Sequence, residues 1–147
     1  NFRMTGYQAA MGLAQTRKLN SIIKKKRKED YTYNKYLSDI EGLQLPVERK
    51  HYKNVYWVYA LNVQPSFGIN RDELMKRLKI EGIETRTFFC SMSDQPCLKR
   101  IKKFKNIKTP IASRIWKTGL YLPSSHTLTN KTISFIAKKL KEIKKTT

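Results

Sequence analysis

Segments with the pattern of a helix alternate with segments rich in strand-forming residues along the whole chain. The stretch 54–63 ("NVYWVYALNV") is mostly aromatic and β-branched, which predicts a well-buried strand. Shorter strands are predicted at 83–89 and in "LYLP", and helical patterns lie before, between and after them. The order long helix, strand, helix, strand, helix, strand, helix predicts an α/β or α+β domain in which helices cover a small sheet.

The first helix is predicted to begin after Thr5 and to run to about Leu37. From residue 17 it has one apolar stripe and a basic face, and Gly42 and Pro46 end it. Its first turns are small on one side, which favours a tight contact with another helix in the core. That side and the stripe consist of Ala9, Ala10, Gly12 and Ala14, followed by Leu19, Ile22, Ile23, Tyr33 and Leu37.

Three later helices carry their own start and stop signals. Asn70 is the expected N-cap of a helix that Gly82 ends, with Glu73 as capping-box partner and Ile69 and Leu74 as a hydrophobic staple. Segment 109–120 has proline at its first helical position and glycine near its end. The last helix is predicted to follow a Thr129 cap and to bury Ile133, Ile136, Ala137, Leu140 and Ile143.

The net charge of +20 comes from 31 basic and 11 acidic residues. Such an excess indicates a polyanionic partner, but most of the basic residues are lysines, which solvated helix faces also accumulate. The sequence leaves both interpretations open. An apolar content of 39% excludes wholesale disorder.

The sequence contains no complete metal site, phosphate loop or pair of nucleophile and base. Cys90 and Cys97 are seven residues apart, a spacing that does not match zinc ligands, and His51 and His126 are isolated. We expect free thiols in a reducing cytoplasm and no bound metal. The sequence also has no apolar run long enough to span a membrane, so we expect a soluble, cytoplasmic protein with no membrane partner.

Several motifs in order resemble the pyridoxal phosphate (PLP)-dependent nucleotide-sugar aminotransferases of the DegT/StrS group, which are fold-type I enzymes. The resemblance begins with "NFRMTGYQAAMGLAQTRKL" and continues through "GLQLP", "NVYWVYAL", "RDELMKRLKIEGIETRTFF", "QP" and "GLYLPSSHTLTNKTISFI". Within the group, "ETRTFF" and "GLYLPSS" are most similar to perosamine-synthetase-type enzymes, which aminate a GDP-linked 4-keto-6-deoxy sugar. The resemblance covers nearly the whole chain.

This resemblance implies that the chain is only the C-terminal part of such an enzyme. The large N-terminal domain of the family supplies the lysine that binds PLP, so we expect no catalytic residue here and no activity of the fragment alone. We expect residues 1–41 to be a helical segment linking to the missing large domain, and 42–147 to be the small C-terminal α/β domain. The family also implies a homodimer with active sites at the subunit interface.

The resemblance assigns four candidate site residues. Asn1 matches the asparagine that contacts the PLP phosphate in the partner subunit's site, and Arg3 is expected near the same phosphates, near the sugar diphosphate, or in a salt bridge across the dimer. Arg86 and Phe88 are expected on the substrate side. Phe88 and the next phenylalanine should point to opposite faces of a strand, one of them into the core.

Two loops are less certain carriers of function. Ser91 and Ser93 stand where proline and histidine are common in the family, which weakens any substrate contact inferred there. Ser124 and Ser125, beside His126, are expected to cap a turn with their hydroxyl groups.

The function that follows is transfer of an amino group, from glutamate, to a nucleotide-linked 4-keto-6-deoxy sugar in perosamine and lipopolysaccharide biosynthesis. Two alternatives stay open: a basic nucleic-acid-binding module, which the charge favours but no recognised fold signature supports, and a non-catalytic dimerising remnant. A remnant with uncovered contact faces should self-associate or dissolve poorly.

Overall fold

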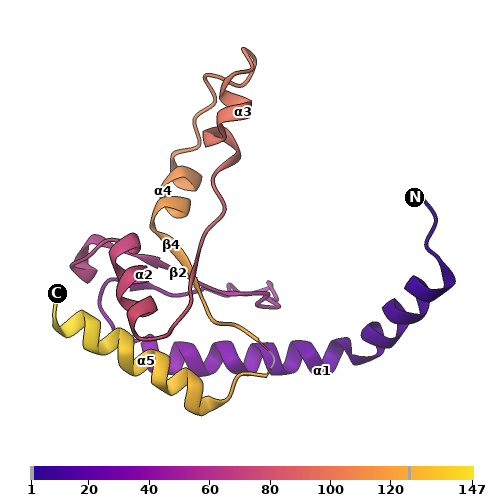
Figure 1. Cartoon of the computed structure of the whole chain (residues 1–147), viewed down its shortest axis with the longest axis horizontal. Coiled ribbons are helices and arrows are strands. Elements are labelled where there is room, and N and C mark those ends of the chain that lie inside the picture. The colour runs from indigo at the N-terminus through magenta and orange to yellow at the C-terminus, as the bar shows by residue number, and fades with distance from the viewer. Residues whose placement is uncertain (1, 126) are drawn as a thin grey trace.

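The computed structural model describes residues 2–125 and 127–147 of the chain. The first helix, α1, runs without a break from Gly6 to Leu37 and extends beyond the rest of the molecule at its N-terminal end (Figure 1). The predicted Thr5 cap is confirmed: Gln8 N–H donates to Thr5 Oγ1 at 3.3 Å, and Thr5 N–H donates to Gln8 Oε1 at 3.0 Å. This reciprocal capping box fixes where α1 begins.

The N-terminal half of α1 lies outside the core. Ala9, Ala10, Gly12 and Ala14 are all exposed, and a Cβ added to Gly12 would meet nothing within 4 Å. The predicted tight contact of this small-residue side with another helix of the core is therefore wrong within the described part of the chain. Burial begins only at Ile22, because α5 and the sheet reach no further along α1 (Figure 1).

We expect Gly12→Ala to stabilise the chain by about 0.5–1 kcal/mol, because glycine in an exposed helix interior leaves the unfolded chain more freedom than alanine does. Urea unfolding followed by circular dichroism measures the change. Gly6→Ala, at the first residue of α1, is the matched control and should change stability less. A loss of stability for Gly12→Ala that depends on protein concentration would contradict this expectation and indicate a second copy packed on this side.

The described residues form one antiparallel sheet in the order β1-β2-β4-β3. Its strands are β1 (Leu43–Gln44), β2 (Tyr59–Val63), β3 (Arg86–Thr87) and β4 (Gly119–Leu122). In the centre, Leu61 pairs with Leu120 and Ala60 with Tyr121. The expected α/β domain with helices on a small sheet is confirmed.

Two strands are shorter than predicted. The central strand begins at Tyr59, not at 54, because Tyr56 has a left-handed φ of 50° and its N–H donates to Asn54 Oδ1 at 2.8 Å. The strand predicted at 83–89 is reduced to Arg86–Thr87, and β1 was not predicted.

The later helices begin and end close to their predicted signals. They are α2 (Arg71–Ile80), α4 (Pro110–Thr118) and α5 (Asn130–Lys145). Asn70 Oδ1 accepts from Glu73 N–H at 2.9 Å, but the Glu73 carboxylate pairs with Arg77 at 3.0 Å and does not complete a capping box. Thr129 Oγ1 caps α5 by accepting from Thr132 N–H at 3.2 Å.

The core lies between one face of the sheet and α1, α2 and α5. Tyr33 of α1 stacks on Tyr59 of β2 with ring centroids 4.4 Å apart, and its hydroxyl donates to Pro123 O at 2.9 Å. The predicted buried stripe of α5 is confirmed. Tyr33, Leu37 and Ile40 of the first segment belong to the same core as the sheet. The expected division of the chain into residues 1–41 and 42–147 stays a prediction.

An arm formed by residues 90–109 projects from the sheet and leads into α4 (Figure 1). It contains two short helices, η2 (Met92–Asp94) and α3 (Pro96–Lys99). Asp94 ties it to α4 by accepting from Ser113 Oγ and from Trp116 Nε1 at 3.1 Å. Together with the bond from Lys99 Nζ at 3.1 Å, these bonds lower the pKa of its carboxyl to about 2. Among the described residues, no helix combines the length and apolar character needed to cross a bilayer.

Candidate substrate-binding face

One face of the sheet is not covered by the long helices. Along β2, Tyr59, Leu61 and Val63 are buried while the residues between them are only half-buried. Tyr121 of β4 is half-buried between Leu120 and Leu122, which are buried. Since neighbouring strand residues point to opposite faces, Tyr121 lies on the side away from the helices. We call this side the open face.

Arg86 lies on the open face because it pairs in register with Tyr121. It helps to line a cavity of about 540 Å³ together with Tyr121, Ser124 and Val58. Its side chain is exposed and forms no ion pair with any described residue. The guanidinium is therefore accessible to an anion.

Phe88 packs flat against the open face. Its ring stacks on Tyr121 at 4.7 Å between centroids with an interplanar angle of 17°, and its N–H donates to Gly119 O at 3.2 Å. A Cβ on Gly119 would lie 2.5 Å from the Phe88 ring, so the glycine leaves the space that the ring occupies. Phe88 is thus placed beside Arg86 on one surface.

The expectation that one of the two phenylalanines is a core residue is wrong. Phe88 is half-buried and Phe89 is 72% exposed. The strict alternation of faces does not hold at these positions because β3 ends at Thr87, before either phenylalanine.

Trp57 is a surface residue that the sequence analysis placed inside a buried strand. It is 71% exposed, and its ring is nearly parallel to that of Phe89, with an interplanar angle of 8° and centroids 6.4 Å apart. The left-handed backbone at Tyr56 interrupts the extended run just before Trp57 and explains its exposure. A run of aromatic residues gives no signal for such a turn.

Arg3, the N-terminal candidate that the structure describes, is not part of this face within one chain. Arg3 is exposed and has no ion-pair partner among residues 2–125 and 127–147. It precedes α1 at the end that extends away from the sheet (Figure 1). Asn1 lies outside the described residues. Their predicted contacts with the phosphates in a partner subunit therefore stay predictions.

The loop after β4 is anchored to α1. Lys26 Nζ contacts Ser124 Oγ and lies 3.4 Å from the Glu29 carboxylate, and the lysine and glutamate side chains are largely buried from solvent. Ser125 Oγ accepts from Thr127 N–H at 3.3 Å, which confirms its predicted role in a turn. Ser124 instead bonds to the lysine, and His126 lies outside the described residues.

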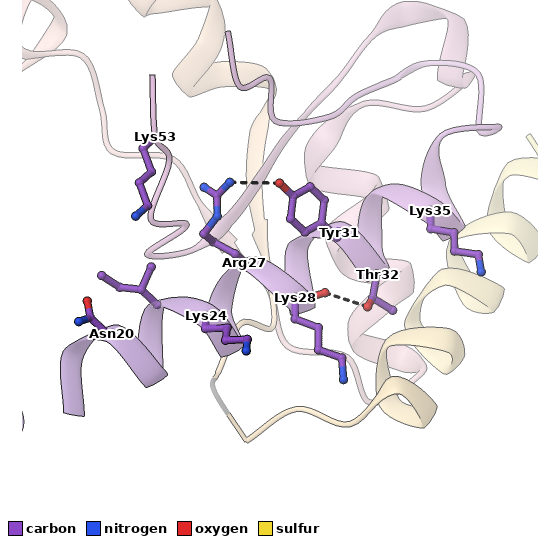
Figure 2. Close-up of a pocket in the computed structure, with 9 residues that line it drawn as sticks. Asn20, Lys24, Arg27, Lys28, Tyr31, Thr32, Lys35 and Lys53 are labelled. Carbon is purple, nitrogen blue, oxygen red and sulfur yellow. Dashed lines mark hydrogen bonds between the residues drawn. The ribbon is translucent and has the colours of Figure 1, made fainter. Parts of the chain in front are cut away.

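A second hollow, the basic groove, runs along the outer side of α1 (Figure 2). The guanidinium of Arg27 is already hydrogen-bonded within the chain. It donates to both carboxylate oxygens of Glu48 at 2.9 and 3.1 Å and to Tyr31 Oη at 3.1 Å. In Figure 2 the side chains of Lys24, Lys28 and Lys35 extend to one side of α1 at separate places along it, and Lys53 comes from another segment, so their charged ends do not meet at one point. Charges that do not converge are typical of a solvated face. The lining residues are Asn20, Ile23, Lys24, Arg27, Lys28, Tyr31, Thr32, Lys35 and Lys53.

The same fold occurs within solved sugar aminotransferases. PseC of Helicobacter pylori, an aminotransferase of pseudoaminic acid biosynthesis, superposes with a TM-score of 0.87 at 18% identity over 100% of this chain and 39% of its own. DesI, solved with its TDP-sugar product, gives 0.79 at 24% identity over 96% and 36%. At these identities the likeness establishes the fold.

Sequence comparison defines the family. Residues 1–141 match the DegT/DnrJ/EryC1/StrS aminotransferase family, and the chain belongs to it. GDP-perosamine synthase of Escherichia coli O157:H7 is 30% identical over 142 residues, 97% of this chain and 37% of that enzyme. The enzyme of the same name from Vibrio cholerae is 30% identical over 84% of this chain and 33% of its own length. The chain thus spans about a third of the curated relatives it matches.

Proposed function

We propose that this chain is the C-terminal part of a PLP-dependent aminotransferase that moves an amino group from glutamate to a nucleotide-linked 4-keto-6-deoxy sugar. The observation that carries the proposal is the family match over residues 1–141, together with relatives named GDP-perosamine synthase. A perosamine pathway, lipopolysaccharide biosynthesis and a cytoplasmic location belong to the same proposal. A relative from Salmonella typhimurium is named a lipopolysaccharide biosynthesis protein.

The open face supports a role on the substrate side. It presents an accessible guanidinium, Arg86, beside aromatic rings and a cavity, which suits a ligand that carries both phosphates and an apolar or planar group. We propose that Arg86 binds the diphosphate and that Phe88 lines the sugar or base pocket.

The described residues do not by themselves form a site for PLP. The one buried lysine among them, Lys26, is bound to Glu29 and Ser124 Oγ, and a covalent cofactor site needs a lysine free to react. We therefore assign PLP to the complete enzyme. A relative from Bacillus subtilis is named a putative PLP-dependent aminotransferase, and one structural neighbour was solved with bound hydrated PLP. No catalytic residue is proposed in this chain.

A homodimer belongs to this proposal. The first half of α1 projects from the domain with exposed apolar side chains, including Tyr7, Met11 and Leu13. Such a helix is suited to reach a second subunit, where Asn1 and Arg3 are proposed to contact cofactor and substrate phosphates.

The test is an amino-transfer assay on the natural polypeptide that contains this chain. With 15N-glutamate, PLP and GDP-4-keto-6-deoxymannose, we expect mass spectrometry to find the label in an amino sugar linked to GDP. Arg86→Gln should lower kcat/KM about 10-fold or more, because a charge-assisted hydrogen bond to phosphate contributes about 1.5–3 kcal/mol.

Arg100→Gln, an exposed arginine on the arm that lines no part of the open-face cavity, is the matched control and should leave the rate close to that of the parent. Absence of label from every nucleotide-linked keto sugar tested would contradict the proposed function. Tight, saturable binding of a nucleic acid in its place would favour the basic binding module.

A further inference from the structure

We propose that Trp57 and Phe89 form a stacking platform for the base of a nucleoside diphosphate whose phosphates lie at Arg86. This inference rests on the proposed function and deepens it, because it names the residues that would recognise the nucleotide part of the substrate. The ligand class is a planar heteroaromatic ring joined to a diphosphate.

The rings of Trp57 and Phe89 lie close together and nearly parallel. Trp57 precedes β2 and Phe89 follows β3, so separate parts of the chain bring them together. Their planes differ by only 8° at 6.4 Å between centroids, within the 4.5–7 Å range of interacting aromatic pairs. Parallel rings present flat surfaces in one direction, which is what a nucleobase needs for stacking.

The side chains of Trp57 and Phe89 are both largely exposed to solvent. Trp57 and Phe89 are 71% and 72% exposed, although each would gain from burial in a core. Among the described residues, the Trp57 indole N–H donates no hydrogen bond that would hold this ring at the surface. Two large rings left side by side in water are typical of a binding surface.

The guanidinium of Arg86 and its cavity lie next to the platform. Phe89 contacts Tyr121, with centroids 6.4 Å apart at 59°, and Tyr121 lines the cavity that Arg86 shares. Val58, adjacent in sequence to Trp57, lines the same cavity. The platform therefore borders the cavity that Arg86 lines together with Glu84, without lining it, and a nucleoside diphosphate has the two matching parts, a planar ring and a diphosphate.

The experiment measures binding of GDP and of inorganic pyrophosphate to the 147-residue chain by calorimetry. We expect Trp57→Ala and Phe89→Ala each to weaken GDP binding about 10-fold, since one base–aromatic stack contributes that much or more, and to leave pyrophosphate binding unchanged. Arg86→Gln should weaken both ligands. In addition, GDP should quench the tryptophan fluorescence of the parent chain more than that of Trp57→Phe, which retains Trp116.

Phe135→Ala removes an exposed aromatic from α5, away from the open face, and serves as the matched control with parent-like GDP affinity. If the parent binds GDP and the Trp57 and Phe89 variants bind it equally well, the platform is wrong while the proposed function stands. If the parent binds neither GDP nor pyrophosphate, both the platform and the phosphate site at Arg86 are wrong, whereas the proposed function is decided by the amino-transfer assay on the complete polypeptide. Circular dichroism of each variant establishes that the fold is kept.

Discussion

Gly42→Ala should destabilise the chain by about 2–5 kcal/mol. Gly42 is buried where the turn after α1 enters β1, and its φ of 86° is one that residues with a Cβ adopt at a cost of about 1–2 kcal/mol. An added Cβ would lie 2.2 Å from Phe67 N and 2.4 Å from its Cα. Because this clash is with backbone and not with a flexible side chain, a further overpacking cost of about 1–3 kcal/mol follows.

Gly82→Ala separates the two costs. Gly82 ends α2 with a φ of 75°, but a Cβ there would meet nothing within 4 Å. It should cost only about 1–2 kcal/mol, from the left-handed conformation alone. Urea unfolding of both variants measures the difference. Equal losses for Gly42→Ala and Gly82→Ala would show that Phe67 moves aside freely and would contradict the close contact described here.

Asp30→Asn should raise stability by about 2 kcal/mol at pH 8 and change it little below pH 4. Asp30 is 1% exposed on α1, and neither carboxylate oxygen has a hydrogen-bond partner among the described residues. Burial raises the pKa of this carboxyl to about 7, although the charge of Lys26 opposes the shift. In the unfolded chain the same carboxyl releases its proton near pH 4. Ionisation therefore stabilises the unfolded state relative to the folded state, and the free energy of unfolding falls, as pH rises from about 4 to about 7.

The stability of the parent should therefore fall across this pH window and then level off, while that of Asp30→Asn should not. Urea unfolding at pH 4 and pH 8 measures both curves. Asp39→Asn is the control: Lys141 Nζ lies 2.8 Å from the Asp39 carboxylate and lowers its pKa, so this exposed substitution should cause a small loss and not a gain. A parent curve that rises from pH 4 to pH 8 would contradict a buried, unpartnered Asp30.

Local signals in the sequence were enough to locate most of the helices. Thr5, Asn70 and Thr129 each cap the helix they were expected to start, and the apolar spacing of α5 is the buried stripe observed. These features depend on neighbours three or four residues away, so the sequence alone carries them. Strand ends depend on pairing with distant segments, and the predicted strands were accordingly too long.

The candidate site was only partly predictable. Arg86 and Phe88 were found through the resemblance of their motif, and the structure places them on one surface with Tyr121. Trp57 was missed because its exposure depends on the backbone turn at Tyr56, and the burial of Asp30 was missed because its position on a charged helix predicts a solvated side chain. Both result from tertiary packing that no local pattern encodes.

An NMR titration of the 147-residue chain with GDP-mannose, a stable analogue of the proposed nucleotide-linked sugar, tests the proposed substrate side of the open face most directly. We expect amide shifts to change around Trp57, Arg86, Phe89 and Tyr121. Shifts confined to the basic groove of Figure 2, and reproduced by a short RNA of the same concentration, would overturn the proposal.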